Sequence, residues 1–157
     1  MILVDANLLL YAVAPESPDH EAAHAWLEAR LNDVDRVGLA WTTLLAFVRL
    51  SSNPRVAARA LSPSQAWAFV EKEWLSRPNV WIPAPGASYA RILTQLFENF
   101  ATTSRKVTDA HAAALAIEHG LILCSADRDF ANLPGLQYMN PLRPTMLHER
   151  RPFYVRR

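Results

Sequence analysis

The sequence lacks the features that mark secreted, membrane-spanning and disulfide-stabilised proteins. Its 157 residues include a single cysteine, Cys124, which cannot form an internal disulfide and suits a reducing cytoplasm. No apolar run approaches the ~20 residues that cross a bilayer. The N-terminus, MILVDANLLLYAV, has no basic segment before its apolar stretch and therefore does not predict a signal peptide. We expect a soluble, cytoplasmic protein without contact to a membrane.

Charge is distributed unevenly along a chain that has the length and composition of one globular domain. Half of the residues (51%) are hydrophobic and 20% are charged, and we find no internal repeat. Residues 1–142 carry a net charge of −3, whereas residues 143–157 carry +4. We therefore divide the chain into a domain, 1–142, and a basic C-terminal tail, 143–157. The tail either contacts RNA or another anionic surface or is simply solvated.

Strand-like and helix-like segments alternate along the chain. Short apolar runs predict strands at 1–5, 37–40, 79–82, 121–125 and 136–139. Helices are predicted at 8–14, from Ser17-Pro18 onward, at 41–50, from Ser62-Pro63 onward, at 89–100 and at 108–119, the last ending at Gly120. This alternation indicates a three-layer α/β/α sandwich with a mainly parallel central sheet.

Four aspartates are predicted to lie at one edge of that sheet. Asp5 and Asp127 directly follow apolar strands, and Asp129 belongs to the same loop as Asp127. Asp109 lies in the first turn of the helix that precedes the fourth strand, which also brings it to the carboxyl edge. Ligands of open parallel sheets bind at this edge. Each aspartate alone has an ordinary alternative role, since it could cap a helix or make a turn. The four together favour a metal site.

Clustered carboxylates repel one another unless a cation lies among them. Oxygen ligands favour Mg²⁺, Mn²⁺ or Ca²⁺ over zinc, and no Cys or His set in the sequence has zinc-like spacing. His20 and His24 are spaced as a possible metal pair but lack a third ligand nearby, so we interpret them as exposed polar residues. A divalent ion held by aspartates could polarise a phosphoryl group and activate water. The pattern thus predicts a metal-dependent hydrolase.

Several motifs resemble those of a known family. The segments are VDANLLLYA at 4–12, GLAWTTLLAFVRLSSNPRV at 38–56, TDAHAAALAIEHG at 108–120, LCSADRDF at 123–130 and NPL at 140–142. They resemble PIN-domain ribonucleases, and most closely the VapC toxins of type II (VapBC) toxin–antitoxin systems. The resemblance covers residues 1 to about 142, with the motifs in the family's order and spacing.

The resemblance implies an endoribonuclease that cleaves tRNA, mRNA or rRNA with Mg²⁺ or Mn²⁺. It implies a homodimer that is neutralised by a VapB-type antitoxin and contacts operator DNA only through the toxin–antitoxin complex. By motif, Asp5, Asp109 and Asp127 match the family's catalytic metal ligands, and Asp129 matches its auxiliary acidic position. Further matches flank the site at Asn7 and Thr108. Arg128 lies between two of the aspartates, where it either contacts the substrate or pairs with them.

One position departs from the family pattern. Most PIN nucleases have a glutamate on the helix after the second strand, where this chain has Ala46. A second metal ion would therefore have fewer carboxylates to hold it. This loss is also the support for the main alternative, a catalytically lapsed PIN-like scaffold that only binds RNA or an antitoxin. Two other classes fit less well, because Asp5-Ala6-Asn7 lacks the second aspartate of haloacid-dehalogenase-type phosphatases and the acidic pair of receiver domains.

Overall fold

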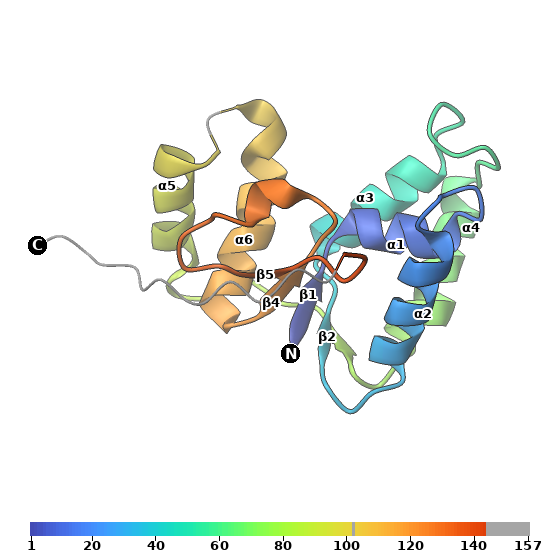
Figure 1. The fold of residues 1–157 in the computed structure, drawn as a ribbon, viewed down its shortest axis with the longest axis horizontal. Coiled ribbons are helices and arrows are strands. Elements are labelled where there is room, and N and C mark those ends of the chain that lie inside the picture. Colours follow the sequence, from blue (N-terminus) through green and yellow to red (C-terminus); the bar gives the residue numbers. More distant parts are fainter. Residues whose placement is uncertain (102, 144–157) are drawn as a thin grey trace, which may run out of the picture.

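A parallel β-sheet forms the centre of the molecule (Figure 1). The computed structural model describes residues 1–101 and 103–143. Its strands are β1 (Ile2–Val4), β2 (Val37–Gly38), β3 (Val80–Trp81), β4 (Ile122–Cys124) and β5 (Gln137–Met139). They pair in the order β3-β2-β1-β4-β5, and every pair is parallel. The predicted α/β/α sandwich with a parallel sheet is confirmed.

Helices cover both faces of the sheet, as Figure 1 shows. One face carries α1 (Ala6–Val13), α2 (His20–Leu31), α3 (Trp41–Ser51), α4 (Pro63–Phe69) and the π-helical turn η1 (Val70–Leu75), and the other carries α5 (Tyr89–Asn99) and α6 (Val107–His119). Two short 3₁₀ turns complete the fold. The turn η2 (Ser104–Lys106) directly precedes α6, and the turn η3 (Arg128–Phe130) follows β4.

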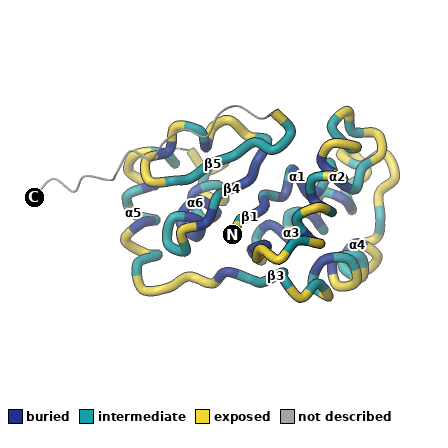
Figure 2. The backbone as a smooth tube through the Cα atoms, turned by 60° about the horizontal axis from the view of Figure 1, so that its bottom comes forward, coloured by how far each residue is buried: buried dark blue, intermediate teal, exposed yellow. Residues whose placement is uncertain are grey.

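Successive side chains along a strand point to opposite faces of the sheet, so each strand contributes to two apolar cores, one on each face. Leu3 and Leu123 point to the α5–α6 side, whereas Val4 and Cys124 point to the side of α1 to α4. All four are at most 1% exposed. Residues that are buried, dark blue in Figure 2, lie along β1, β4 and the inner faces of the helices. Since a sheet buried on both faces needs apolar residues at consecutive positions, the unbroken apolar runs of the sequence are explained.

Local signals fix several helix ends as expected. Ser62 and Gln65 form a reciprocal capping box at the start of α4, with Pro63 at the first helical position. Gly120 ends α6 with a φ of 63°, the left-handed conformation that favours glycine. The helix predicted from residue 8 starts earlier, at Ala6, because the Asp5 side chain accepts a hydrogen bond from the Ala6 amide.

One detail of the prediction was wrong. Ser17-Pro18 does not open α2, because the Ser17 hydroxyl accepts a hydrogen bond from the Asp19 amide within a turn and the helix begins at His20. The helix predicted from Ser62 is present, and after Phe69 it widens into η1. The ring nitrogens of His20 and His24 contact backbone carbonyls of α1, so these histidines join two helices.

No helix in the described part of the chain is long and apolar enough to cross a membrane. Of the predicted basic tail, Arg143 belongs to the described residues, and positions 144–157 lie outside them.

Candidate functional site

The candidate site lies where the connectivity of the sheet changes direction. From β1 the chain proceeds to β2 and β3 on one side, and it later returns to place β4 on the other side of β1. Loops that leave β1 and β4 therefore diverge at their carboxyl ends, which is where parallel sheets bind ligands. Asp5 follows β1 and donates its amide to the Cys124 carbonyl at 3.0 Å. Ser125 to Asp127 follow β4 at the same edge.

Asp5 is held by hydrogen bonds from three directions. Its Oδ1 accepts from the Ala6 amide at 2.7 Å, and its Oδ2 accepts from Asn7 Nδ2 at 2.9 Å and from Ser125 Oγ at 2.7 Å. Ser125 is fully buried, and its Oγ also accepts from Asn7 Nδ2 at 2.9 Å and from the Asp127 amide at 3.0 Å. One serine hydroxyl thus positions both strand-end aspartates.

Asn7 joins the two loops of the site. Its Nδ2 contacts Asp5 and Ser125, and its Oδ1 accepts a hydrogen bond from the Ala126 amide at 3.2 Å. The side chain therefore connects the first turn of α1 to the loop after β4, 119 residues away. An amide suits this position, because it presents a donor and an acceptor at once.

Asp127 and Asp129 form an exposed turn at η3. Asp127 Oδ1 accepts from the Asp129 amide at 2.9 Å, so Asp127 also caps this short turn. Asp129 Oδ2 pairs with Lys106 Nζ at 2.8 Å, across from the start of α6. Lys106 further lies over the ring of Phe100, 4.7 Å from its centroid.

Asp109 shares the electrostatic field of these aspartates. It lies in the first turn of α6, as predicted, and burial raises its pKa, followed by the charges of Asp5 and Asp127. Burial is also the largest cause that raises the pKa of Asp5, while the hydrogen bonds from Ser125 and Ala6 oppose it. Negative charge at this edge is therefore only partly compensated by the protein itself.

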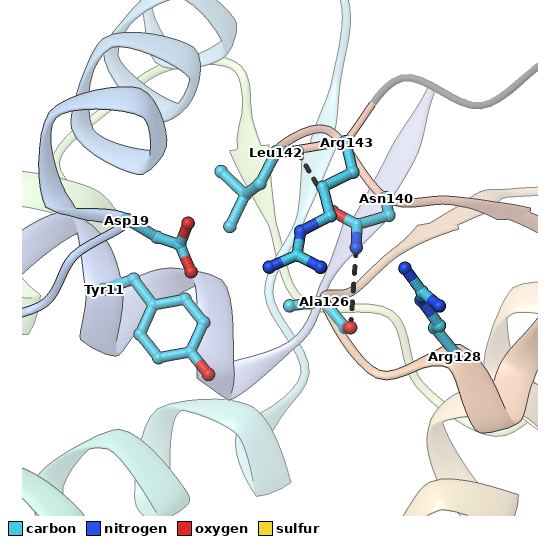
Figure 3. A pocket seen from close by; sticks show the side chains of 7 residues that line it. All are labelled: Tyr11, Asp19, Ala126, Arg128, Asn140, Leu142 and Arg143. Atoms are coloured by element: carbon cyan, nitrogen blue, oxygen red, sulfur yellow. Dashed lines mark hydrogen bonds between the residues drawn. The ribbon is translucent and has the colours of Figure 1, made fainter.

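A polar cleft lies beside the loop that carries Asp127, on the side of the C-terminal segment (Figure 3). It has a volume of about 210 Å³ and is lined by Tyr11, Asp19, Ala126, Arg128, Asn140, Leu142 and Arg143. Figure 3 shows the Arg143 guanidinium between Asp19 and Asn140, with Arg128 on the other side of Asn140. Asn140 spans its rim, since its Nδ2 donates to the Ala126 carbonyl at 3.5 Å and its Oδ1 accepts from the Leu142 amide at 3.0 Å.

The carboxylates match the donor chemistry of a hard divalent cation, because every candidate ligand is an oxygen. Among residues 1–101 and 103–143, no three His, Cys, Asp or Glu side chains converge closely enough to form a ready ligand cage. Like-charged carboxylates repel one another, and a bound cation would offset that repulsion. Asp5, Asp109 and Asp127 nevertheless act on one another electrostatically, which fits a cation-binding site.

Ser125 was missed by reasoning from sequence, and so was the pairing of Lys106 with Asp129. Ser125 has a usable signal, because it is the polar residue between a buried strand and a site aspartate. Thr108 is exposed beside Asp109, and Ala46 is half-buried on α3. Because position 46 is alanine, α3 supplies no carboxylate there.

Comparison with known proteins decides the family. The family described as "PIN domain" matches residues 2–136. Ribonuclease VapC33 of Mycobacterium tuberculosis is 40% identical over 143 residues, which cover 91% of this chain and 99% of that protein. The chain belongs to the VapC branch of the PIN-domain family. VapC37 of the same organism is also 40% identical, over 90% of this chain and 97% of its own length.

Solved structures share the fold of this PIN domain. FitAcB from Neisseria gonorrhoeae aligns with a TM-score of 0.61 and 24% identity, covering 90% of this chain and 98% of its own. VapBC2 from Rickettsia felis, bound to a DNA fragment from its promoter, aligns at 0.63 and 16%, covering 89% and 98%. VapC20 of Mycobacterium tuberculosis, described as a sarcin–ricin loop cleaving toxin, aligns at 0.61 and 18%, covering 83% and 93%.

Proposed function

We propose that this PIN domain is a Mg²⁺- or Mn²⁺-dependent endoribonuclease and the toxin of a type II toxin–antitoxin system. The observation that carries the proposal is that Asp5 and Asp127 follow the neighbouring strands β1 and β4 at the same edge of the sheet and are both hydrogen-bonded to Ser125 Oγ. The 40% identity to proteins named ribonuclease VapC supports RNA as the substrate. A site of this composition needs a cation before all three carboxylates can be ionised without penalty.

The chain's own residues divide the work of the site. Asp5, Asp109 and Asp127 would hold the ion, with Asp129 at the edge of the cluster. A divalent ion bound there supplies polarisation of the phosphodiester and a lowered pKa for a bound water. Asn7 and Ser125 keep the Asp5 carboxylate aimed at the site through their hydrogen bonds. Such supporting contacts to metal ligands govern affinity and activity strongly.

The cleft beside Asp127 gives RNA a place to bind. Arg128 lines it from the turn between two site aspartates, and the Tyr11 ring lines its opposite side. A guanidinium contacts a phosphate without reading sequence, and an aromatic ring can stack on an unpaired base. Arg128 therefore serves as a substrate-positioning residue, and Thr108 flanks the path at the start of α6.

Partners follow from the family and from the solved complexes. FitAB and VapBC2 are described as assemblies bound to DNA, and a VapBC-1 complex comes from nontypeable Haemophilus influenzae. We propose a homodimer that is neutralised by a VapB-type antitoxin and contacts operator DNA only within that complex. Exposed apolar side chains on α3, Trp41 (52% exposed) and Leu45 (60% exposed), offer surface for such contacts.

The deciding experiment is cleavage of total bacterial RNA with Mg²⁺ or Mn²⁺, in the absence of any antitoxin. Wild type is compared with an Asp5→Asn/Asp127→Asn double variant and with Asp35→Asn, an exposed aspartate in the loop before β2, as the control. We expect discrete fragments from wild type and Asp35→Asn, and none from the double variant. Cleavage by the double variant would overturn the site assignment. If none of the proteins cleaves RNA in either metal, the alternative of a catalytically lapsed scaffold is favoured.

A further inference from the structure

Lys106 lies at the junction of two helical elements. It is the last residue of the 3₁₀ turn η2 and the residue at the N-terminal cap of α6. Its side chain makes no capping hydrogen bond. The ammonium group therefore makes its contacts outside α6.

The ammonium group of Lys106 is held in place by two contacts. Nζ lies 2.8 Å from Asp129 Oδ2 and 4.7 Å from the centroid of the Phe100 ring. The charge of Lys106 also acts on Asp109 and Asp127. The Asp129 side chain in this ion pair is 56% exposed. An ion pair that is this open to solvent contributes little to the stability of the fold. These contacts instead hold the positive charge of Lys106 at one side of the acidic site.

We infer that Lys106 acts as a built-in cation that limits the site to one divalent ion. The inference rests on the proposed metal dependence. Lys106 neutralises Asp129 and keeps its carboxylate engaged, so Asp129 contributes little to coordination in the wild type. It also repels a second divalent ion from that side. Three carboxylates, Asp5, Asp109 and Asp127, are left for a single ion, and Ala46 supplies no replacement.

The chain provides a matched control for this inference. It contains two lysines, Lys72 and Lys106. Lys72 also pairs with a carboxylate, with its Nζ 3.2 Å from Glu73 Oε1, but it lies in η1 with an 83% exposed side chain. Lys72→Gln therefore removes the same charge and the same kind of ion pair away from the site. Lys106→Arg keeps the charge in place.

The test is calorimetric titration of the RNA-free protein with Mn²⁺. Wild type, Lys72→Gln and Lys106→Arg should bind one ion per chain. Lys106→Gln should bind two, with the first bound roughly tenfold more tightly, because one positive charge that would repel a divalent ion is removed from the side of the site. Raising the salt concentration should reduce this gain in affinity. In Lys106→Gln/Asp129→Asn the second ion should be lost again.

Four outcomes would overturn the inference without affecting the proposed metal dependence. One is a Lys106→Gln variant that still binds a single ion, and another is a wild type that binds two. The third is a double variant that keeps the second ion, which would show that Asp129 is not the released ligand. The fourth is weaker RNA binding by Lys106→Gln at unchanged Mn²⁺ stoichiometry, which would make Lys106 an RNA contact. If no variant binds Mn²⁺ at all, the inference fails together with the proposed metal dependence, whereas the other outcomes leave that dependence intact.

Discussion

Ser125 donates a hydrogen bond from its Oγ to Asp5 Oδ2 at 2.7 Å, which joins the ends of two neighbouring strands whose residues are 120 positions apart in sequence. The same oxygen accepts from the Asp127 amide and from Asn7 Nδ2. The hydroxyl therefore has all of its hydrogen-bonding capacity in use within the site, and two of its three partners are proposed metal ligands.

Replacing Ser125 with alanine should impair both stability and activity. The change leaves the Asp127 amide without its buried partner, which costs about 1–3 kcal/mol. It also removes a hydrogen bond that lowers the pKa of Asp5, so that pKa rises further and the acid limb of the pH–activity profile moves to higher pH. We expect activity to fall about 10- to 100-fold, as for other contacts that support metal ligands.

Urea unfolding and a pH–activity profile measure these two effects. Ser51→Ala is the matched control, because Ser51 is also buried but its hydroxyl makes one hydrogen bond, to the Val48 carbonyl on its own helix. Ser51→Ala should leave the pH profile unchanged. An unaltered profile for Ser125→Ala would show that Ser125 does not control Asp5.

Asp109 should destabilise the metal-free protein at neutral pH. Its folded-state pKa is raised above the ordinary value of 3.8, mainly by burial and then by Asp5 and Asp127. The folded state therefore binds a proton more readily than the unfolded state, and stability falls as the pH rises from about 3.8 through the raised pKa. Asp109→Asn removes this penalty. We expect it to gain up to about 1 kcal/mol at pH 7, a small value because solvent screens the partly exposed group.

Urea unfolding in the presence of a chelator, at pH 7 and near pH 3, tests this sign. The two proteins should differ at pH 7 and converge near pH 3, where the carboxyl is protonated in both folded and unfolded states. An Asp109→Asn variant that is less stable than wild type at pH 7 would contradict the assignment of Asp109 to a repulsive cluster.

The sequence was informative where local chemistry decides structure. Asp5 and Asp127 could be placed at one edge because each follows a buried apolar run, and parallel strands align their carboxyl ends. The Ser62-Pro63 start and the Gly120 end depend on backbone groups within a few residues, so they too were predictable. These features require no knowledge of the tertiary arrangement.

Other features depend on contacts that are distant in sequence. The bridge from Asn7 to Ala126 and the pairing of Lys106 with Asp129 arise only when β1, β4 and α6 are assembled. Trp74 of the wide turn η1 packs against Phe47 of α3, with ring centroids 4.7 Å apart, which is another contact between segments distant in sequence. Roles in metal and RNA binding stay predictions, since they concern ligands rather than the fold.

The capping box of α4 offers a test of stability apart from the site. Ser62 accepts from the Gln65 amide at 3.2 Å, and Gln65 Oε1 accepts from the Ser62 amide at 2.9 Å. Ser62→Ala should cost about 1 kcal/mol and lower the melting temperature by about 2–4 °C. Nuclease activity at 25 °C should be unchanged, because α4 contributes no residue to the site. A loss of activity without a loss of stability would reveal an unexpected link between α4 and catalysis.

Metal binding should be visible as thermal stabilisation, independently of any RNA substrate. An ion that binds the folded state alone adds about 2.7 kcal/mol at a concentration 100 times its Kd. For a chain of this size, the melting temperature then rises by about 5–10 °C. Asp5→Asn should lose most of this rise, since it removes a charge at the centre of the cluster. Asp129→Asn should retain most of it, because Lys106 already engages that carboxylate. Equal losses in both variants would place Asp129 among the principal ligands, and no rise in the wild type would argue against a metal site at this edge of the sheet.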